Sequence, residues 1–193
     1  FHAGDVARAV DAGTAAGGSS VNAAVKAQVV YGHYLEKSDK AKLALFEEAA
    51  AWADARRAEA PKDANAHYLH AFALGRYSQC ISVGKALAQG LGGKIKESLL
   101  AAMKLQPKHA DANIAYGAYQ AEVIDKVGGL VAGMTYGAKK DSAVEHFEKA
   151  IKLFPEAAIA RIERESASRL AGTGGREPQI NSVRRRQSRA AMF

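Results

Sequence analysis

The sequence predicts an all-α protein, a solenoid of about three enlarged helical hairpins, and three observations lead to this fold class. Alanine dominates a hydrophobic share of 48%, while aromatic residues make up only 7%. Such a composition suits closely packed helices better than a β-sandwich. Apolar residues recur at helical spacing between residues 21 and 170, and similar segments recur around three prolines within this stretch.

The three prolines mark the ends of the predicted hairpins. Pro61, Pro107 and Pro155 lie 46 and 48 residues apart, and residues 61–66 resemble residues 107–112. A proline just past a helix ends it, because its ring disfavours the α conformation of the preceding residue and removes a donor. Repetition at such a period is typical of stacked helical repeats.

Local signals support a helix on either side of each proline. Asp63 follows Pro61 and offers a side-chain cap to the next helix. Before Pro155, apolar residues follow one another at helical spacing and form a continuous stripe. This stripe consists of Ala143, Phe147, Ala150, Ile151 and Phe154.

These positions resemble the tetratricopeptide repeat (TPR), which has small, large and small residues twelve, eight and five places before its proline. The last unit matches with Ala143, Phe147 and Ala150, and the middle unit matches well with Ile95, Leu99 and Ala102. The first unit, with Ala49, Ala53 and Arg56, matches poorly. The resemblance implies a right-handed stack of helical hairpins.

The units depart from an ordinary TPR by their length. A TPR has 34 residues, whereas here two segments, 81–93 and 127–138, add about 12 to 14 residues between the helices of a hairpin. Both segments, called the first and second insert below, are apolar and rich in glycine. Gly129, Gly133 and Gly137 predict close packing of the inserts, which could also form the wall of an apolar cleft.

With residues 75–78, the inserts make the chain similar to two families between residues 21 and 163. One is the T-component of tripartite ATP-independent periplasmic (TRAP) transporters, which implies a periplasmic helical protein with a hydrophobic cleft. The other is the regulator of microtubule dynamics family, which implies a cytosolic or membrane-tethered adaptor. The compartment therefore stays open, with the bacterial cytoplasm and periplasm as candidates.

Composition divides the chain into three regions. We expect a flexible lead-in over residues 1–20, the TPR-like helical domain over 21–171, and a basic, disordered tail over 172–193. The tail has five arginines and one glutamate and accounts for much of the net charge of +7. No aromatic residue interleaves with these arginines, so we expect nonspecific electrostatics and no specific nucleic-acid partner. No apolar run reaches the length of a transmembrane segment.

No constellation of residues indicates catalysis, a metal or a cofactor. Cys80 has no recognisable histidine and acid partners, and His67 and His70, one helical turn apart, lack further ligands for zinc. Residues 90–94 do not have the spacing of a phosphate-binding loop. We therefore predict that the chain is not an enzyme and has no cofactor.

Two functions remain. The first is a protein-interaction scaffold, with a protein or peptide partner bound along the first helices of the hairpins. The alternative is a binder of a small apolar or organic-acid ligand in a cleft formed by the inserts. Arg76 and Glu122 occupy equivalent repeat positions and are predicted to meet. The residues predicted to contact a ligand or partner are Arg76, Tyr77, Lys85, Glu122, Lys126 and Tyr136.

Overall fold

A computed structural model describes residues 3–155, 162, 164 and 165, and within them the chain is all-α, as predicted. The helices in chain order are α1 (Ala3–Ala16), α2 (Ser20–Tyr34), α3 (Asp39–Glu59), α4 (Ala64–Gln79), α5 (Val83–Ala88), α6 (Leu91–Leu105), α7 (Ala110–Val127), α8 (Gly129–Val131), the π-helix η1 (Ala132–Tyr136) and α9 (Lys140–Leu153).

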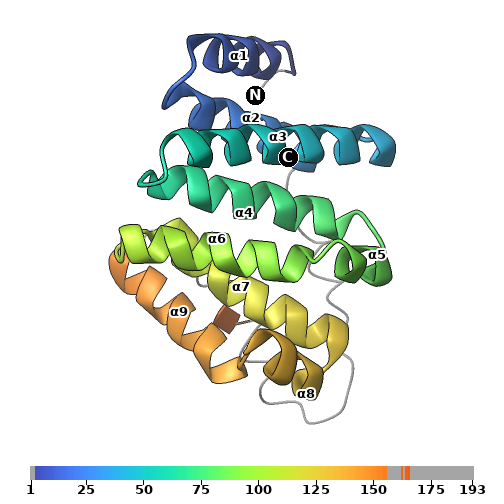
Figure 1. The fold of residues 1–193 in the computed structure, drawn as a ribbon, viewed down its shortest axis with the longest axis vertical. Helices are drawn as coiled ribbons and strands as arrows, with labels where there is room; N and C mark the ends of the chain where they lie inside the picture. The colour runs from blue at the N-terminus through green and yellow to red at the C-terminus, as the bar shows by residue number, and fades with distance from the viewer. Residues whose placement is uncertain (1–2, 156–161, 163, 166–193) are drawn as a thin grey trace.

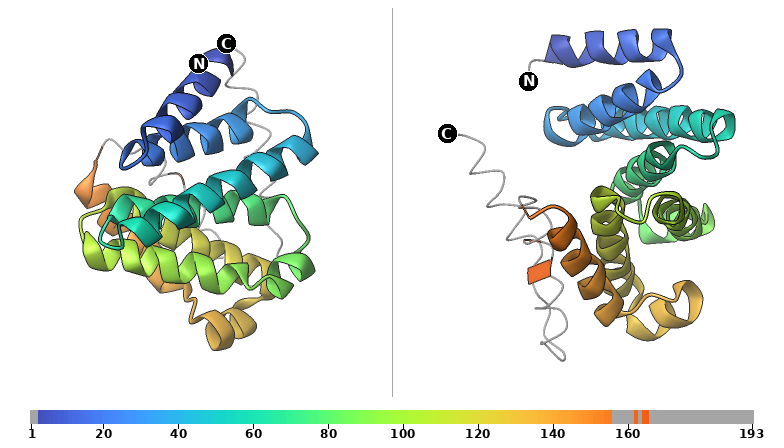
Figure 2. Two further views of the ribbon diagram at one scale, coloured as in Figure 1. Left: turned by 45° about the horizontal axis from the view of Figure 1, so that its top comes forward. Right: turned by 90° about the vertical axis from the view of Figure 1, so that its left-hand side faces the viewer.

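The long helices stack one on the next along the longest axis of the molecule (Figure 1). Each long helix packs on its successor: α1 on α2, α2 on α3, α3 on α4, α4 on α6, α6 on α7, and α7 on α9. Helix α4 also contacts α2 and α7, so these three first helices of the hairpins lie together (Figure 2). The short helices α5, α8 and η1 belong to the two inserts.

The helix ends follow the signals in the sequence. Helices α3, α6 and α9 end two residues before Pro61, Pro107 and Pro155, so the predicted boundaries are confirmed. The Asp63 side chain accepts hydrogen bonds from the backbone N–H groups of Asn65 and Ala66 and thereby caps α4, as predicted.

Two hairpins cross through the same contact between a glycine and a phenylalanine. Phe46 on α3 and Phe147 on α9 are fully buried. A Cβ atom added at Gly32 on α2 would lie 2.8 Å from the Phe46 ring, and one added at Gly117 on α7 would lie 2.8 Å from the Phe147 ring. Because both approaches are closer than a real Cβ contact, glycine lets these helices pack at short range.

The flexible lead-in predicted for residues 1–20 is wrong for Ala3–Ala16, which form α1. Val6 and Val10, one turn apart, are buried, and Gly13 allows α1 to approach Ala24 of α2 closely. Two valines alone do not predict a helix here, because glycine and alanine dominate the segment around them. The predicted tail over residues 172–193 lies outside the described residues, as does most of residues 156–171.

Candidate functional site: a groove over helix α4

An open groove of about 340 Å³ runs over α4 between α3 and α6. Helix α3 forms one wall, the start of α6 forms the other, and α4 lies beneath. The lining residues are Glu47, Ala50, Ala51, Asp54, His70, Leu74, Tyr77, Gln89, Leu91 and Lys94.

The groove combines an apolar floor with charged walls. Leu74 and Tyr77 of α4 form the floor together with Leu91, which is buried at the start of α6. Glu47 and Asp54 are seven residues apart, which is about two turns of α3, so they lie on one face of that helix. Between them the groove on this wall is lined by Ala50 and Ala51, so no large side chain separates the two carboxylates.

His70 is the most deeply placed polar group of the groove, with an exposed fraction of 6%. Its Nδ1 atom lies 2.8 Å from the hydroxyl oxygen of Ser98 on α6, and its Nε2 atom lies 3.9 Å from Oδ1 of Asp54. Burial, together with the guanidinium of Arg57, lowers the pKa of His70 to about 4. The ring is therefore neutral near pH 7.

Asp54 remains charged at the same pH. A hydrogen bond from Nε of Arg57, 2.5 Å long, lowers the pKa of the Asp54 carboxyl, and Lys94 across the groove acts in the same direction. Ser98, His70 and Asp54 thus form a row, but Ser98 is only 1% exposed. The row presents a neutral imidazole and a carboxylate to the groove and keeps the hydroxyl group away from it.

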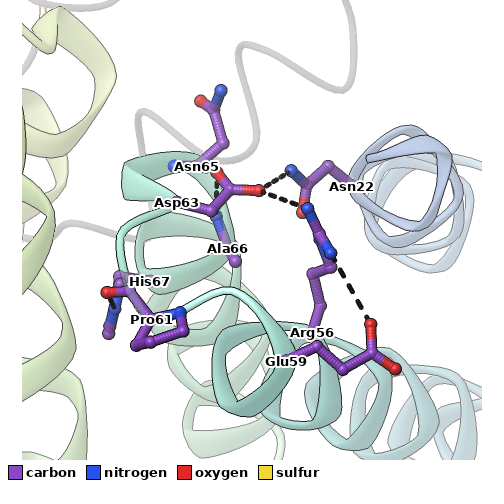
Figure 3. A network of polar contacts seen from close by, with 8 residues as sticks. All are labelled: Asn22, Arg56, Glu59, Pro61, Asp63, Asn65, Ala66 and His67. Atoms are coloured by element: carbon purple, nitrogen blue, oxygen red, sulfur yellow. Dashed lines mark hydrogen bonds and ion pairs between the residues drawn. The ribbon is translucent and has the colours of Figure 1, made fainter. Parts of the chain in front are cut away.

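A polar network at one end of α4 fixes the position of α3 and α4 (Figure 3). Oδ2 of Asp63 accepts a hydrogen bond of 2.9 Å from Asn22 of α2 and lies 3.4 Å from Nη2 of Arg56 on α3. Burial alone would raise the pKa of Asp63, but the hydrogen bonds and Arg56 outweigh it and lower the pKa. One carboxylate thus caps α4 and joins three helices.

On the side of α4 that faces α7, the predicted pair Arg76 and Glu122 is linked through Gln79. Nη1 of Arg76 donates to the Gln79 side chain at 3.1 Å, and Nε2 of Gln79 donates to Glu122 on α7 at 3.2 Å. Lys26 of α2 forms an ion pair with Asp111 of α7, with 3.7 Å between Nζ and Oδ2. These contacts join α2, α4 and α7 across one face.

The other predicted site residues do not form one cluster. Tyr77 lines the groove and is 9% exposed, while Lys85 on α5 and Lys126 at the end of α7 are exposed. Tyr136 in η1 lies against Gly92, where an added Cβ would be 2.7 Å from its ring, and its carbonyl accepts a hydrogen bond of 2.7 Å from Lys96.

The glycine ladder does not pack as predicted. An added Cβ at Gly133 would meet only the carbonyl oxygen of Ala138 at 3.9 Å, and one at Gly129 would meet nothing within 4 Å. The inserts are joined instead through Gly92 and Tyr136. Gly129 and Gly133 lie on the continuous helical segment formed by α8 and η1, whereas Gly137 ends this segment in a left-handed conformation, so the three glycines do not lie on one helix.

Sequence reasoning missed the walls of the groove. It considered His70 as a zinc ligand and did not single out Glu47, Asp54 or Lys94. A usable signal existed on α3, where two acidic residues two turns apart flank small residues. The signal on α6 was weaker, because Lys94 follows directly after the glycine-rich first insert.

Within the described residues, no group of three or more potential metal ligands is found, and no helix is both long and apolar enough to cross a membrane. A model of the family described as regulator of microtubule dynamics protein 1-3 matches residues 18–161. No curated protein matches the chain significantly. The TPR and T-component resemblances remain predictions.

Proposed function

Because the chain belongs to the regulator of microtubule dynamics protein 1-3 family, we propose that it is a non-catalytic helical scaffold that binds a segment of a partner protein. The observation that carries this proposal is the open groove over α4. A bound segment would lie between α3 and α6, with apolar side chains on Leu74 and Tyr77.

The arrangement of the helices supports the interpretation as a TPR-like solenoid. The hairpins are α2–α3, α4–α6 and α7–α9, and two of them share the crossing of a glycine over a buried phenylalanine. Contacts between α2, α4 and α7 place the first helices of the hairpins side by side. Solenoids of this type expose long surfaces that suit extended partners.

The chemistry of the groove favours a peptide. Its volume of about 340 Å³ holds a few side chains, and it is open along its length rather than enclosed. Ala50 and Ala51 would let a peptide backbone approach α3, while Glu47, Asp54 and Lys94 could pair with charges of either sign. Such an apolar floor with a polar rim is typical of protein interfaces.

A small organic acid is the second candidate for the same groove. Lys94 supplies an ammonium group at the groove wall, and His70 adds a neutral imidazole to the lining. This candidate differs from the cleft that the sequence predicted between the two inserts, because the first insert lines the groove only at Gln89 and Leu91 and the second insert does not line it.

The experiment is a selection of random peptides displayed on phage against the full chain, followed by binding measurements on an obstructed variant. Ala51 is exposed in the groove wall, so Ala51→Trp fills the groove without disturbing the core. Ala55→Trp, at an exposed position of the same helix that does not line the groove, is the matched control.

We expect the selected peptides to bind the parent chain and the Ala55→Trp variant equally, and to bind Ala51→Trp at least about tenfold more weakly, as when an interface anchor is lost. Selected peptides that bind all three proteins alike would place the binding surface elsewhere. A selection that yields no peptide, combined with a shift of melting temperature by small organic acids, would favour the second candidate.

A further inference from the structure

The two inserts turn their large apolar side chains outward. Among the described residues, five large hydrophobic side chains of the inserts are exposed. Their exposed fractions are 39% for Val83, 48% for Leu87, 77% for Leu130, 49% for Val131 and 81% for Met134. We call the surface formed by these five residues the insert edge.

The insert edge is assembled from segments about 40 residues apart in the sequence. Helix α5 packs against α6, and η1 is held to the first two turns of the same helix by the contact of Tyr136 with Gly92 and by the hydrogen bond from Lys96. Both inserts therefore lie beside the beginning of α6. They are found on the same side of the molecule, to the right in Figure 1.

Basic side chains accompany the insert edge. Lys85 lies on α5 between Val83 and Leu87, while Lys126 and Lys139 flank the second insert; all three are exposed, and none forms an ion pair within the described part of the chain. Lys140 is also exposed here, whereas Asp125 and Asp141 are the exposed acids flanking the second insert. Positive charge is therefore in excess around the edge.

We propose that the insert edge docks on the surface of a lipid bilayer that contains anionic lipids. Leu130 and Met134 would enter the boundary of the acyl region, with Val131, Val83 and Leu87 behind them. Lys85, Lys126 and Lys139 would contact the lipid phosphates. Interfacial binding of this kind depends on buried apolar area together with attraction to anionic headgroups.

The shape of the edge favours a bilayer over a folded partner. The apolar side chains project from helices of three, five and six residues and do not border the groove described above. A bilayer accommodates separate protruding side chains, and lysine ammonium groups can stay at headgroup level while their stems lie against apolar surface. This docking does not depend on the proposed function of the groove over α4.

The test compares two double variants of the full chain in cosedimentation with vesicles of phosphatidylcholine, with and without phosphatidylserine. Leu130→Gln/Met134→Gln removes the most exposed apolar groups of the edge. Leu100→Gln/Leu105→Gln, which changes two exposed leucines of α6 outside the inserts, is the matched control. The arginines of residues 172–193 are present in every protein, so their attraction to vesicles is the same in each comparison.

We expect the parent chain to bind vesicles with phosphatidylserine and the control to bind equally. The Leu130→Gln/Met134→Gln variant should bind at least about tenfold more weakly, since two exposed apolar side chains can no longer be buried. Lys126→Gln/Lys139→Gln should weaken binding to the anionic vesicles roughly fivefold per lysine removed. Unchanged melting temperatures would show that all variants are folded.

Equal binding of the parent chain, the Leu130→Gln/Met134→Gln variant and the control would overturn the proposal, because the attraction would then come from outside the insert edge. Absence of binding by the parent chain at low salt would overturn it as well. So would a parent dimer in light scattering that Leu130→Gln/Met134→Gln dissociates, because the edge would then be covered by a second copy of the chain.

Discussion

The hairpins α2–α3 and α7–α9 have the same crossing but very different connections. In the first, residues 35–38 join the two helices directly, whereas in the last, residues 128–139 form α8 and η1 on the way. Both nevertheless bring a glycine against a fully buried phenylalanine at the same distance. The crossing is therefore set by the residues at the contact and does not depend on the length of the connection between the two helices.

The two hairpins differ in how their second helix relates to its proline. Helix α3 has 21 residues and α9 has 14. Phe147 lies eight residues before Pro155, whereas Phe46 lies fifteen residues before Pro61. The shift of seven residues is close to two helical turns, so the large residue keeps its face while it moves along the helix.

The largest expected effect comes from removing the two rings. Phe147→Ala and Phe46→Ala should each lower the free energy of unfolding by about 3–5 kcal/mol, because each leaves a cavity at a helix crossing. Denaturant unfolding measures both. If the two losses differ by more than the spread of such substitutions, the crossings are not equivalent and the comparison between the hairpins fails.

The middle hairpin differs from the other two, because α4 and α6 bring together a buried polar pair, His70 and Ser98. Burial lowers the pKa of His70 to about 4, below the ordinary value of 6.5. The folded state therefore favours the neutral ring, and this stability is present above pH 6.5 and is lost as the pH falls from 6.5 toward 4.

For His70 alone, the loss between pH 7 and pH 5 amounts to about 2 kcal/mol. His109 and His146, whose pKa values burial also lowers, add to the effect in the same direction. Guanidinium unfolding at the two pH values should show a smaller difference for His70→Gln than for the parent chain. An equal difference would mean that His70 is protonated in the folded state without penalty.

How much the sequence predicts depends on which features are local. The helix ends at the prolines and the cap by Asp63 could be predicted, because each depends on a few neighbouring residues. The buried face of α9, with Ala143, Phe147 and Ala150, could be predicted for the same reason. The poor match in the first unit has a simple cause, since its large residue is displaced by two turns and counting back from Pro61 therefore reaches Ala53 instead of Phe46.

The candidate site was less predictable, because it depends on contacts between segments far apart in the sequence. Glu47 and Asp54 become a groove wall only when α6 brings Lys94 to the other side of α4. Repeat symmetry predicted that Arg76 and Glu122 meet, but that symmetry could not show that Gln79 links them. The inserts lack a repeat register, so the outward orientation of Leu130 and Met134 could not be predicted.

The smallest expected effect concerns glycine in the insert, compared with glycine at the crossing. Gly117→Ala should lower the free energy of unfolding by about 1–2 kcal/mol, because overpacking outweighs the better helix propensity of alanine. At this position a Cβ would meet both the Phe147 ring at 2.8 Å and the Ala143 carbonyl oxygen at 3.0 Å. The backbone oxygen cannot move aside as freely as the end of a side chain.

Gly133→Ala, by contrast, should change the free energy of unfolding by less than about 0.5 kcal/mol, as is usual for positions that make no close contact. Its added Cβ would have one neighbour at 3.9 Å, an ordinary van der Waals distance. Thermal unfolding of the two variants and of the parent chain measures both changes in stability. A loss at Gly133 as large as that at Gly117 would show that the second insert is packed as tightly as the helix crossing, which would contradict the difference between the two positions.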